Sequence, residues 1–136
     1  MQINITTDYA IRIELYLAGR KNLTTSVDIA SAMGIPSGYV LKITKKLVNA
    51  GILLRVVGSR GGFLLAVTAE QIALYDIIEL MESTTKLNRC LEDDEYCSRF
   101  ATVNCPVRKF YCNLQEQIEK SLKEISIADL VNNKQI

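Results

Sequence analysis

A glycine-rich segment, GSRGG, separates two short apolar runs and strongly limits what the surrounding chain can form. In the stretch ILLRVVGSRGGFLLAV, each run is long enough for a strand and the glycines stand at the midpoint between them. Two apolar runs joined by a short glycine-containing segment are typical of an antiparallel β-hairpin. We therefore expect a hairpin over residues 52–67, with GSRGG at its tip.

Three helical patterns precede this hairpin: TTDYAIRIELYLAGR, TTSVDIASAM and SGYVLKITKKLVNAG. Thr6 or Thr7 is the expected N-cap of the first helix, and Thr25 or Ser26 that of the second. Helical spacing predicts three buried faces, made of Ile11, Leu15 and Leu17, of Val27, Ile29, Ala30 and Met33, and of Val40, Ile43, Leu47 and Val48. A short helix, a turn at Gly34 and a second helix with a basic exposed face are typical of a helix-turn-helix.

Basic side chains are concentrated in the part of the chain that holds these patterns. Residues 1–62 carry eight basic and three acidic side chains, a net charge of +5, whereas residues 63–136 carry eight basic and twelve acidic ones, a net charge of −4. An ordinary solvated helix face is the alternative explanation, but the charge asymmetry and the hairpin in the next position favour binding to double-stranded DNA. The expected DNA contacts are base readout by Ser37, Tyr39 and Lys42, phosphate contacts by Lys45 and Lys46, and entry of Arg60 in the wing into the minor groove.

The second half of the chain contains a short helical pattern, a polar loop and a long helical pattern. A capping box from Thr68 to Gln71 opens the first of these, TAEQIALYDIIELME. The second begins at Pro106 and carries apolar residues every three or four positions: Val107, Phe110, Tyr111, Leu114, Ile118, Leu122 and Ile125. A helix this long has more apolar face than so short a chain needs for itself, so we expect it to pack against its copy in a homodimer. Packing over its own core is the alternative.

All four cysteines lie between residues 90 and 112, and the chain has no histidine. In a reducing compartment, clustered cysteines are more often metal ligands or redox centres than disulfides. Thiolates are the usual ligands of iron–sulfur clusters, and Cys105 at a helix start is a favourable place for a thiolate. A zinc site would usually show paired C-x₂₋₄-C motifs, but six, seven and six residues stand between successive cysteines. Zinc, or a cluster-free thiol switch formed by oxidation, stays open as an alternative.

Several motifs together resemble the IscR/NsrR-type regulators of the Rrf-two superfamily of winged-helix transcription factors. They are TTDYAIRIELYLA, LVNAGIL, GSRGGFLLA, IALYDIIELME, the three loop cysteines and the ending ADLVNN. The resemblance implies a homodimer whose operator binding is tuned by a [2Fe–2S] or [4Fe–4S] cluster that senses nitric oxide, redox state or iron–sulfur status. It also implies that Cys90, Cys97 and Cys105 are the cluster ligands.

The fourth ligand is where this chain departs from its relatives. The resemblance places a histidine of the housekeeping branch at the position of Arg108, which cannot ligate iron. It leaves two candidates, Asp8, which matches the aspartate of the nitric-oxide-sensing branch, and Cys112. If Cys105 and Cys112 lie on one helix, seven residues separate them by roughly 10 Å along its axis, which favours Asp8 slightly.

Other classes of protein fit the sequence less well. The chain has no histidine, nucleophile elbow, phosphate loop or nucleotide fingerprint, so we expect no enzymatic activity. An electron-transfer protein could use a cluster but would not need a basic helix-turn-helix. The sequence shows neither a signal peptide nor an apolar run of roughly 18 residues, so we expect a cytoplasmic protein without a membrane partner.

The expected fold is mainly α-helical with a small β-hairpin wing, and the expected organisation has three parts. Residues 1–82 are predicted to form the winged helix-turn-helix with a supporting helix, and residues 83–104 the cysteine-bearing loop. Residues 105–136 are predicted to form the dimerisation helix and a C-terminal tail.

Overall fold

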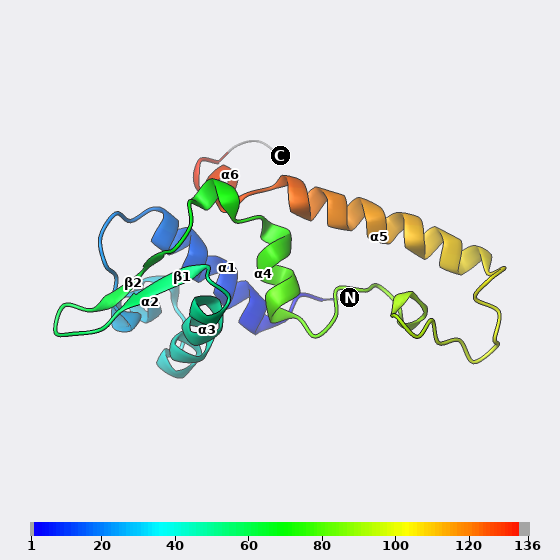
Figure 1. The fold of residues 1–136 in the computed structure, drawn as a ribbon, viewed down its shortest axis with the longest axis horizontal. Helices are drawn as coiled ribbons and strands as arrows, with labels where there is room; N and C mark the ends of the chain where they lie inside the picture. The colour runs from blue at the N-terminus through cyan, green and yellow to red at the C-terminus, as the bar shows by residue number, and fades with distance from the viewer. Residues whose placement is uncertain (1, 134–136) are drawn as a thin grey trace.

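The computed structural model describes residues 2–133, which form a mostly helical fold with a small two-stranded sheet (Figure 1). The three predicted N-terminal helices are α1 (Ile5–Ala18), α2 (Ser26–Met33) and α3 (Ser37–Asn49). Strands β1 (Leu53–Val56) and β2 (Gly62–Leu65) then pair antiparallel, with Leu53 opposite Leu65. The predicted fold class, helical with a hairpin wing, is confirmed.

The second half of the chain extends away from this unit. A 3₁₀ turn, η1 (Ala69–Gln71), and helix α4 (Leu74–Met81) lead into the cysteine-bearing loop, which contains the short turn η2 (Arg89–Leu91). Figure 1 shows α5 (Pro106–Glu124) as a long helix that projects from the globular part, with the loop running out to its far end. Helix α6 (Ile127–Val131) brings the chain back to the globular part.

Helix α1 lies at the centre of the packed core, where it contacts α2, α3, α4, α6 and β2. Ala10, Ile13 and Leu17 of α1 are buried in one apolar cluster that also contains Ile127 of α6. Two backbone hydrogen bonds attach the chain around α6 to the chain at the start of α4. The N–H of Ile127 donates to the carbonyl of Ile72 at 2.9 Å, and the N–H of Leu74 donates to the carbonyl of Ile125 at 2.8 Å. The C-terminal helix therefore packs with the N-terminal unit. The predicted three-part division stays a prediction, and residues 134–136 of its tail lie outside the described residues.

The start of α1 differs from the prediction. Asn4 is the N-cap, because its side-chain oxygen accepts a hydrogen bond from the backbone N–H of Thr6 at 3.0 Å, so Thr6 and Thr7 lie inside the helix. The hydroxyl of Thr7 instead donates to the carboxylate of Glu82 at 2.6 Å, which joins the start of α1 to the end of α4.

The predicted buried face of α1 is also only partly right, since Leu17 is buried but Ile11 and Leu15 are half-buried. The buried face is formed by Thr7, Ala10, Ile13, Glu14 and Leu17. It combines small, polar and larger apolar side chains, because α1 contacts α2, α3, α4, α6 and β2, and Ile11 and Leu15 lie at its edges.

Two further corrections concern helix ends. Val27 is 71% exposed, because the first turn of α2 faces solvent, although Thr25 caps that turn as predicted. The predicted capping box from Thr68 to Gln71 exists but holds η1 rather than α4. Helix α4 begins later, where the backbone N–H of Ala73 donates to the carboxylate of Asp76 at 3.1 Å.

The hairpin requires glycine at two positions near its tip. A side chain at Gly61 would lie 2.4 Å from the carbonyl oxygen of Val56, and one at Gly62 would lie 2.7 Å from that of Thr24. The close approach at Gly62 arises because Phe63 and Thr24 exchange two backbone hydrogen bonds, of 2.9 and 3.2 Å. The wing is therefore anchored to the segment between α1 and α2.

Candidate nucleic-acid interface and cysteine loop

The exposed face of α3 carries the side chains predicted to contact DNA. Ser37 is the first residue of α3, and Tyr39 is 42% exposed. Lys42, Lys45 and Lys46 are exposed on the same helix, and Arg60 is exposed at the tip of the hairpin. Within residues 2–133 no ion pair involves any of these four cations, so their charge is available to a polyanion. The contacts themselves stay predictions.

The opposite face of α3 holds the helix in the core. Val40, Ile43 and Leu47 are at most 2% exposed, as the apolar spacing predicts. Thr44 is buried among them, and its hydroxyl donates to the carbonyl of Val40 at 2.7 Å. The basic side chains are thus presented from a rigid element, a favourable arrangement for recognition of the DNA major groove.

Arg12 on α1 makes contacts that reach towards the start of α3. Its guanidinium forms an ion pair with Asp8 at 2.6 Å, lies 5.5 Å from the ring centroid of Tyr9 and donates to the carbonyl of Met33 at 3.4 Å. The ring of Tyr9 in turn packs edge to face against Tyr39, with centroids 5.6 Å apart. Asp8, a candidate cluster ligand, is therefore connected by contacts to a candidate base-reading residue. Sequence reasoning missed Arg12, whose i, i+4 spacing from Asp8 was the available signal.

All four thiols, two in the cysteine loop and two at the start of α5, are free and half-buried. In the described part of the chain, no three cysteine, aspartate or glutamate side chains lie close enough to hold one metal ion. Hydrogen bonds from the backbone amides of Ala101 and Arg99 lower the pKa of Cys97, with smaller contributions from the amide of Phe100 and the charge of Arg99. Cys97 therefore lies in surroundings that favour a thiolate, the form that binds metals and reacts with oxidants.

Helix α5 begins at Pro106, as predicted, so Cys105 caps the helix and Cys112 lies within it. Cys105 is the N-cap, and its sulfur accepts a hydrogen bond from the backbone N–H of Arg108 at 3.4 Å. Both thiols line an open cavity of about 550 Å³ at this end of the helix. The seven-residue separation places them roughly 10 Å apart along the axis, too far for easy ligation of one compact cluster by both.

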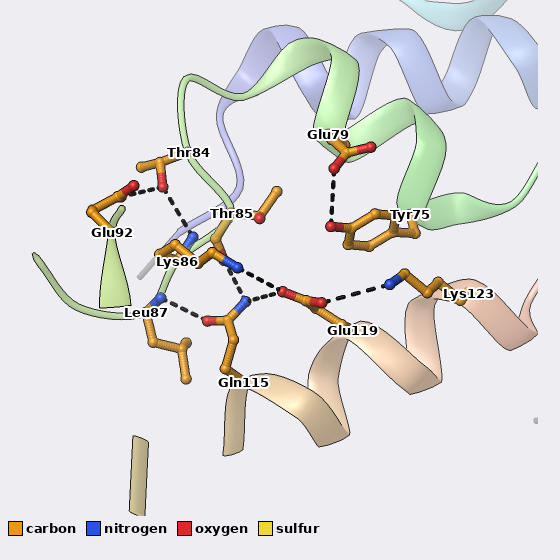
Figure 2. A network of polar contacts seen from close by, with 10 residues as sticks. All are labelled: Tyr75, Glu79, Thr84, Thr85, Lys86, Leu87, Glu92, Gln115, Glu119 and Lys123. Atoms are coloured by element: carbon orange, nitrogen blue, oxygen red, sulfur yellow. Dashed lines mark hydrogen bonds and ion pairs between the residues drawn. The ribbon is translucent and has the colours of Figure 1, made fainter. Parts of the chain in front are cut away.

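A network of polar contacts attaches the start of the loop to the middle of α5 (Figure 2). Gln115, the residue of α5 that is buried, accepts a hydrogen bond from the backbone N–H of Leu87 and donates to the carbonyl of Thr85, both at 2.9 Å. Glu119 pairs with Lys86 at 3.2 Å and also accepts from the Gln115 amide at 2.9 Å. The sequence does not single out Gln115, because Glu116 and Gln117 beside it are polar too, and only the structure shows which of the three is buried.

The side chain of Glu14 is buried in the core. Its residue exposure is 0%, and neither carboxyl oxygen has a hydrogen-bond partner among residues 2–133. Burial raises the pKa of Glu14 to about 8, so the group is mostly protonated at neutral pH. The signal in the sequence was an acidic residue on the apolar face of α1, between Ala10 and Leu17.

The apolar stripe of α5 is only partly covered by the described residues of the protomer, where the helix contacts α4 and η2. Val107 and Phe110 are 52% and 63% exposed. The other five residues of the stripe are half-buried: Tyr111, Leu114, Ile118, Leu122 and Ile125. Independently of this stripe, no helix in residues 2–133 has the length and hydrophobicity that spanning a membrane requires.

Comparison with known proteins identifies the family. A family model named Rrf2, described as an iron-dependent transcriptional regulator, matches residues 3–133. An HTH-type transcriptional regulator of Aquifex aeolicus is 36% identical over 128 residues, which cover 93% of this chain and 89% of the relative. Among solved structures, CymR, the global cysteine regulator of B. subtilis, superposes with a TM-score of 0.81 at 22% identity, over 99% of both chains. T. potens IscR superposes with a TM-score of 0.78 at 20% identity, over 99% of this chain and 89% of that one.

The two solved structures support the winged-helix fold, and the family model and the Aquifex relative establish the family. Regulators of this kind act by binding DNA and are not enzymes. The chain belongs to the Rrf2 family of DNA-binding transcriptional regulators.

Proposed function

We propose that this regulator binds its operator as a homodimer and that an iron–sulfur cluster on the cysteine loop tunes the binding. The observation that carries the proposal is the combination of four free thiols between residues 90 and 112 with a backbone turn that favours the thiolate of Cys97. The description of the matching family as iron-dependent supports the same function.

DNA binding is assigned to the exposed face of α3 and to the wing. Ser37, Tyr39 and Lys42 would read bases, and Lys45 and Lys46 would contact phosphates. Arg60 at the wing tip would enter the neighbouring minor groove. Exposure of these side chains, and the absence of ion pairs to the four cations among the described residues, support the assignment.

The donor set fits an iron–sulfur cluster by its chemistry, since three thiolates from Cys90, Cys97 and Cys105 are ligands that such clusters prefer. Asp8 is the preferred fourth ligand over Cys112, because Cys105 and Cys112 are separated along α5. When bound, a [2Fe–2S] or [4Fe–4S] cluster supplies a centre that reacts with nitric oxide or oxygen and is lost when iron is scarce.

Asp8 would connect this site to DNA binding through residues of the chain itself. Its carboxylate holds Arg12, which also contacts Tyr9 and the carbonyl of Met33 before α3. A change of partner at Asp8 would release Arg12 and alter the surroundings of Tyr39. Coupling of this kind typically changes the free energy of binding, here to DNA, by about 1 to 3 kcal/mol.

A thiol switch without a cluster, or a zinc site, is the second candidate. The thiol switch, but not the zinc site, is favoured by one observation: the described residues do not bring three metal donors together. The neighbour CymR is described as a cysteine regulator, a function that concerns sulfur rather than iron. Nitric oxide, redox state and iron–sulfur status thus stay proposed signals, and the thiols are central to each alternative.

An absorption spectrum of anaerobically purified protein, with iron and acid-labile sulfide assayed on the same sample, separates these candidates. Charge-transfer bands with matching iron and sulfide are expected for the cluster. Comparison of cluster-loaded and cluster-free protein on the same duplex at fixed salt then tests regulation. Equal affinities would contradict it, and a protein that stays colourless after reconstitution would move the assignment to thiol chemistry or zinc.

A further inference from the structure

The cysteine loop is attached to α5 at two separate points before it reaches Cys97. One attachment is made by Arg108 in the first turns of the helix, and the other by Gln115, seven residues further along. Both residues act on the backbone of the loop, so the attachments fix its path and not only its side chains.

The attachment at Arg108 holds Cys90 directly. Its Nε–H donates to the backbone carbonyl of Cys90 at 3.0 Å, while a terminal nitrogen of the same guanidinium pairs with Glu95 at 3.0 Å. The planar guanidinium can make both contacts at once, which a lysine ammonium at this position could not do with the same geometry. The resemblance places a histidine ligand of the housekeeping branch at the position of Arg108, and in this chain the residue at that position holds the loop.

The attachment at Gln115 holds the segment just before Cys90. Figure 2 shows its amide between the loop and the helix, accepting from the N–H of Leu87 and donating to the carbonyl of Thr85 and to Glu119. The hydrogen bond from Gln115 and then the ion pair with Lys86 lower the pKa of Glu119, so this carboxylate stays charged and keeps Lys86 bound. Because the Gln115 side chain is buried, water cannot easily replace the bonds that it makes to the loop.

Cys97 lies beyond both attachments and depends on its own turn. The backbone carbonyl of Cys97 accepts a hydrogen bond from the N–H of Phe100 at 2.9 Å, so residues that follow Cys97 in the chain close its turn. The loop therefore has a part fixed to α5, which contains Cys90, and a part around Cys97 that is held by its own turn.

We propose that Arg108 and Gln115 are positioning residues of the sulfur site, which fix Cys90 to α5 while leaving Cys97 to its own turn. The proposal deepens the function proposed above and rests on it for what the thiols do. It assigns Arg108 a role in place of ligation and makes Gln115 part of the site, although neither side chain would touch iron.

The test is the rate of alkylation of each thiol by iodoacetamide, measured by mass spectrometry on full-length, metal-free protein. Loss of an attachment lets the loop open more often, so the half-buried Cys90 should react faster. We expect Arg108→Ala and Gln115→Ala to raise the ratio of Cys90 to Cys97 rates roughly tenfold. Arg108→Lys should behave like Arg108→Ala, because it keeps the charge but loses the directed Nε–H bond.

Two variants serve as matched controls. Gln117→Ala removes the same side chain from an exposed position of α5, and Lys109→Ala removes one positive charge beside Arg108; both should leave the ratio unchanged. An unchanged ratio in Arg108→Ala and Gln115→Ala, or an equal rise at both thiols, would overturn the proposal. The assay uses neither DNA nor iron, so its outcome is separate from that of the proposed regulation.

Discussion

Tyr9 of α1 and Tyr39 of α3 meet edge to face, with ring centroids 5.6 Å apart and ring planes at 75°. Aromatic pairs in this geometry contribute about 0.5–1.5 kcal/mol beyond the area that they bury. The orientation of the start of α3 therefore depends on a side chain that is placed on another helix, next to Asp8 and Arg12. This relationship makes the DNA-facing surface sensitive to changes in α1.

Replacement of Tyr9 tests this dependence. We expect Tyr9→Leu to lower the free energy of unfolding by about 1 kcal/mol, because the edge-to-face contact is lost. It should also weaken DNA binding at fixed salt, whereas Tyr9→Phe keeps the ring and should change neither quantity. Denaturant unfolding and fluorescence anisotropy with a labelled duplex measure the two effects. Wild-type affinity in a destabilised Tyr9→Leu protein would show that α3 is oriented by other contacts.

The lysines of α3 should act on DNA through charge rather than sequence. We expect Lys45→Ala to weaken binding to all duplexes by a similar factor and to reduce the slope of log affinity against log salt by roughly 1. Tyr39→Ala should instead change the preference between sequences, because its position at the start of α3 suits base readout. Anisotropy titrations at several salt concentrations, with operator and scrambled duplexes, distinguish the two. Altered sequence preference in Lys45→Ala would refute the phosphate assignment.

The sequence predicted the elements well wherever periodicity and end signals agreed. Apolar residues at helical spacing located α3 and α5, Gly34 marked the end of α2 with a φ of 64°, and GSRGG marked the hairpin tip. The start of α1 was misplaced because a cap is a specific hydrogen bond: Asn4, Thr6 and Thr7 are all able to cap a helix, and only the structure shows which one does.

The sequence predicted which residues belong to the candidate sites, but not which groups those residues contact. Exposure of the basic side chains followed from the helical face, so Lys45 and Lys46 were found. The partners of Arg108 and Gln115 could not be found, because both contact backbone groups about 20 to 30 residues away, and backbone groups leave no mark in a sequence. Whether the cysteines share one metal is a question of loop path, which spacing alone does not determine.

Glu14 should make the folded protein less stable as the pH rises. Its pKa is about 8 in the folded protein against 4.5 when exposed, so the folded state holds the proton more tightly. The associated stability is fully present below pH 4.5 and is lost as the pH rises through about 8. We expect the free energy of unfolding to fall by up to about 1.4 kcal/mol per pH unit in this range.

The Glu14→Leu variant isolates this effect, since it removes the carboxyl and fills the same apolar surroundings. Denaturant unfolding between pH 5.5 and 7.5 should show a shallower pH dependence and, at the upper end, a more stable protein. The range is favourable because the chain has no histidine to titrate within it. Glu70→Gln, at an exposed position, is the control and should retain the wild-type slope. Parallel curves for wild type and Glu14→Leu would show that Glu14 gains a partner in solution.

The partly exposed stripe of α5 predicts how the proposed homodimer can be disrupted. Phe110 is 63% exposed in the protomer, so a charge at this position costs the single chain little but would be buried against a second copy. We expect Phe110→Glu to sediment as a folded monomer at micromolar concentration, where the wild type sediments as a dimer. Gln117→Glu adds the same charge at an exposed polar position and should remain dimeric. A wild type that is itself monomeric would mean that α5 keeps its apolar face for another partner.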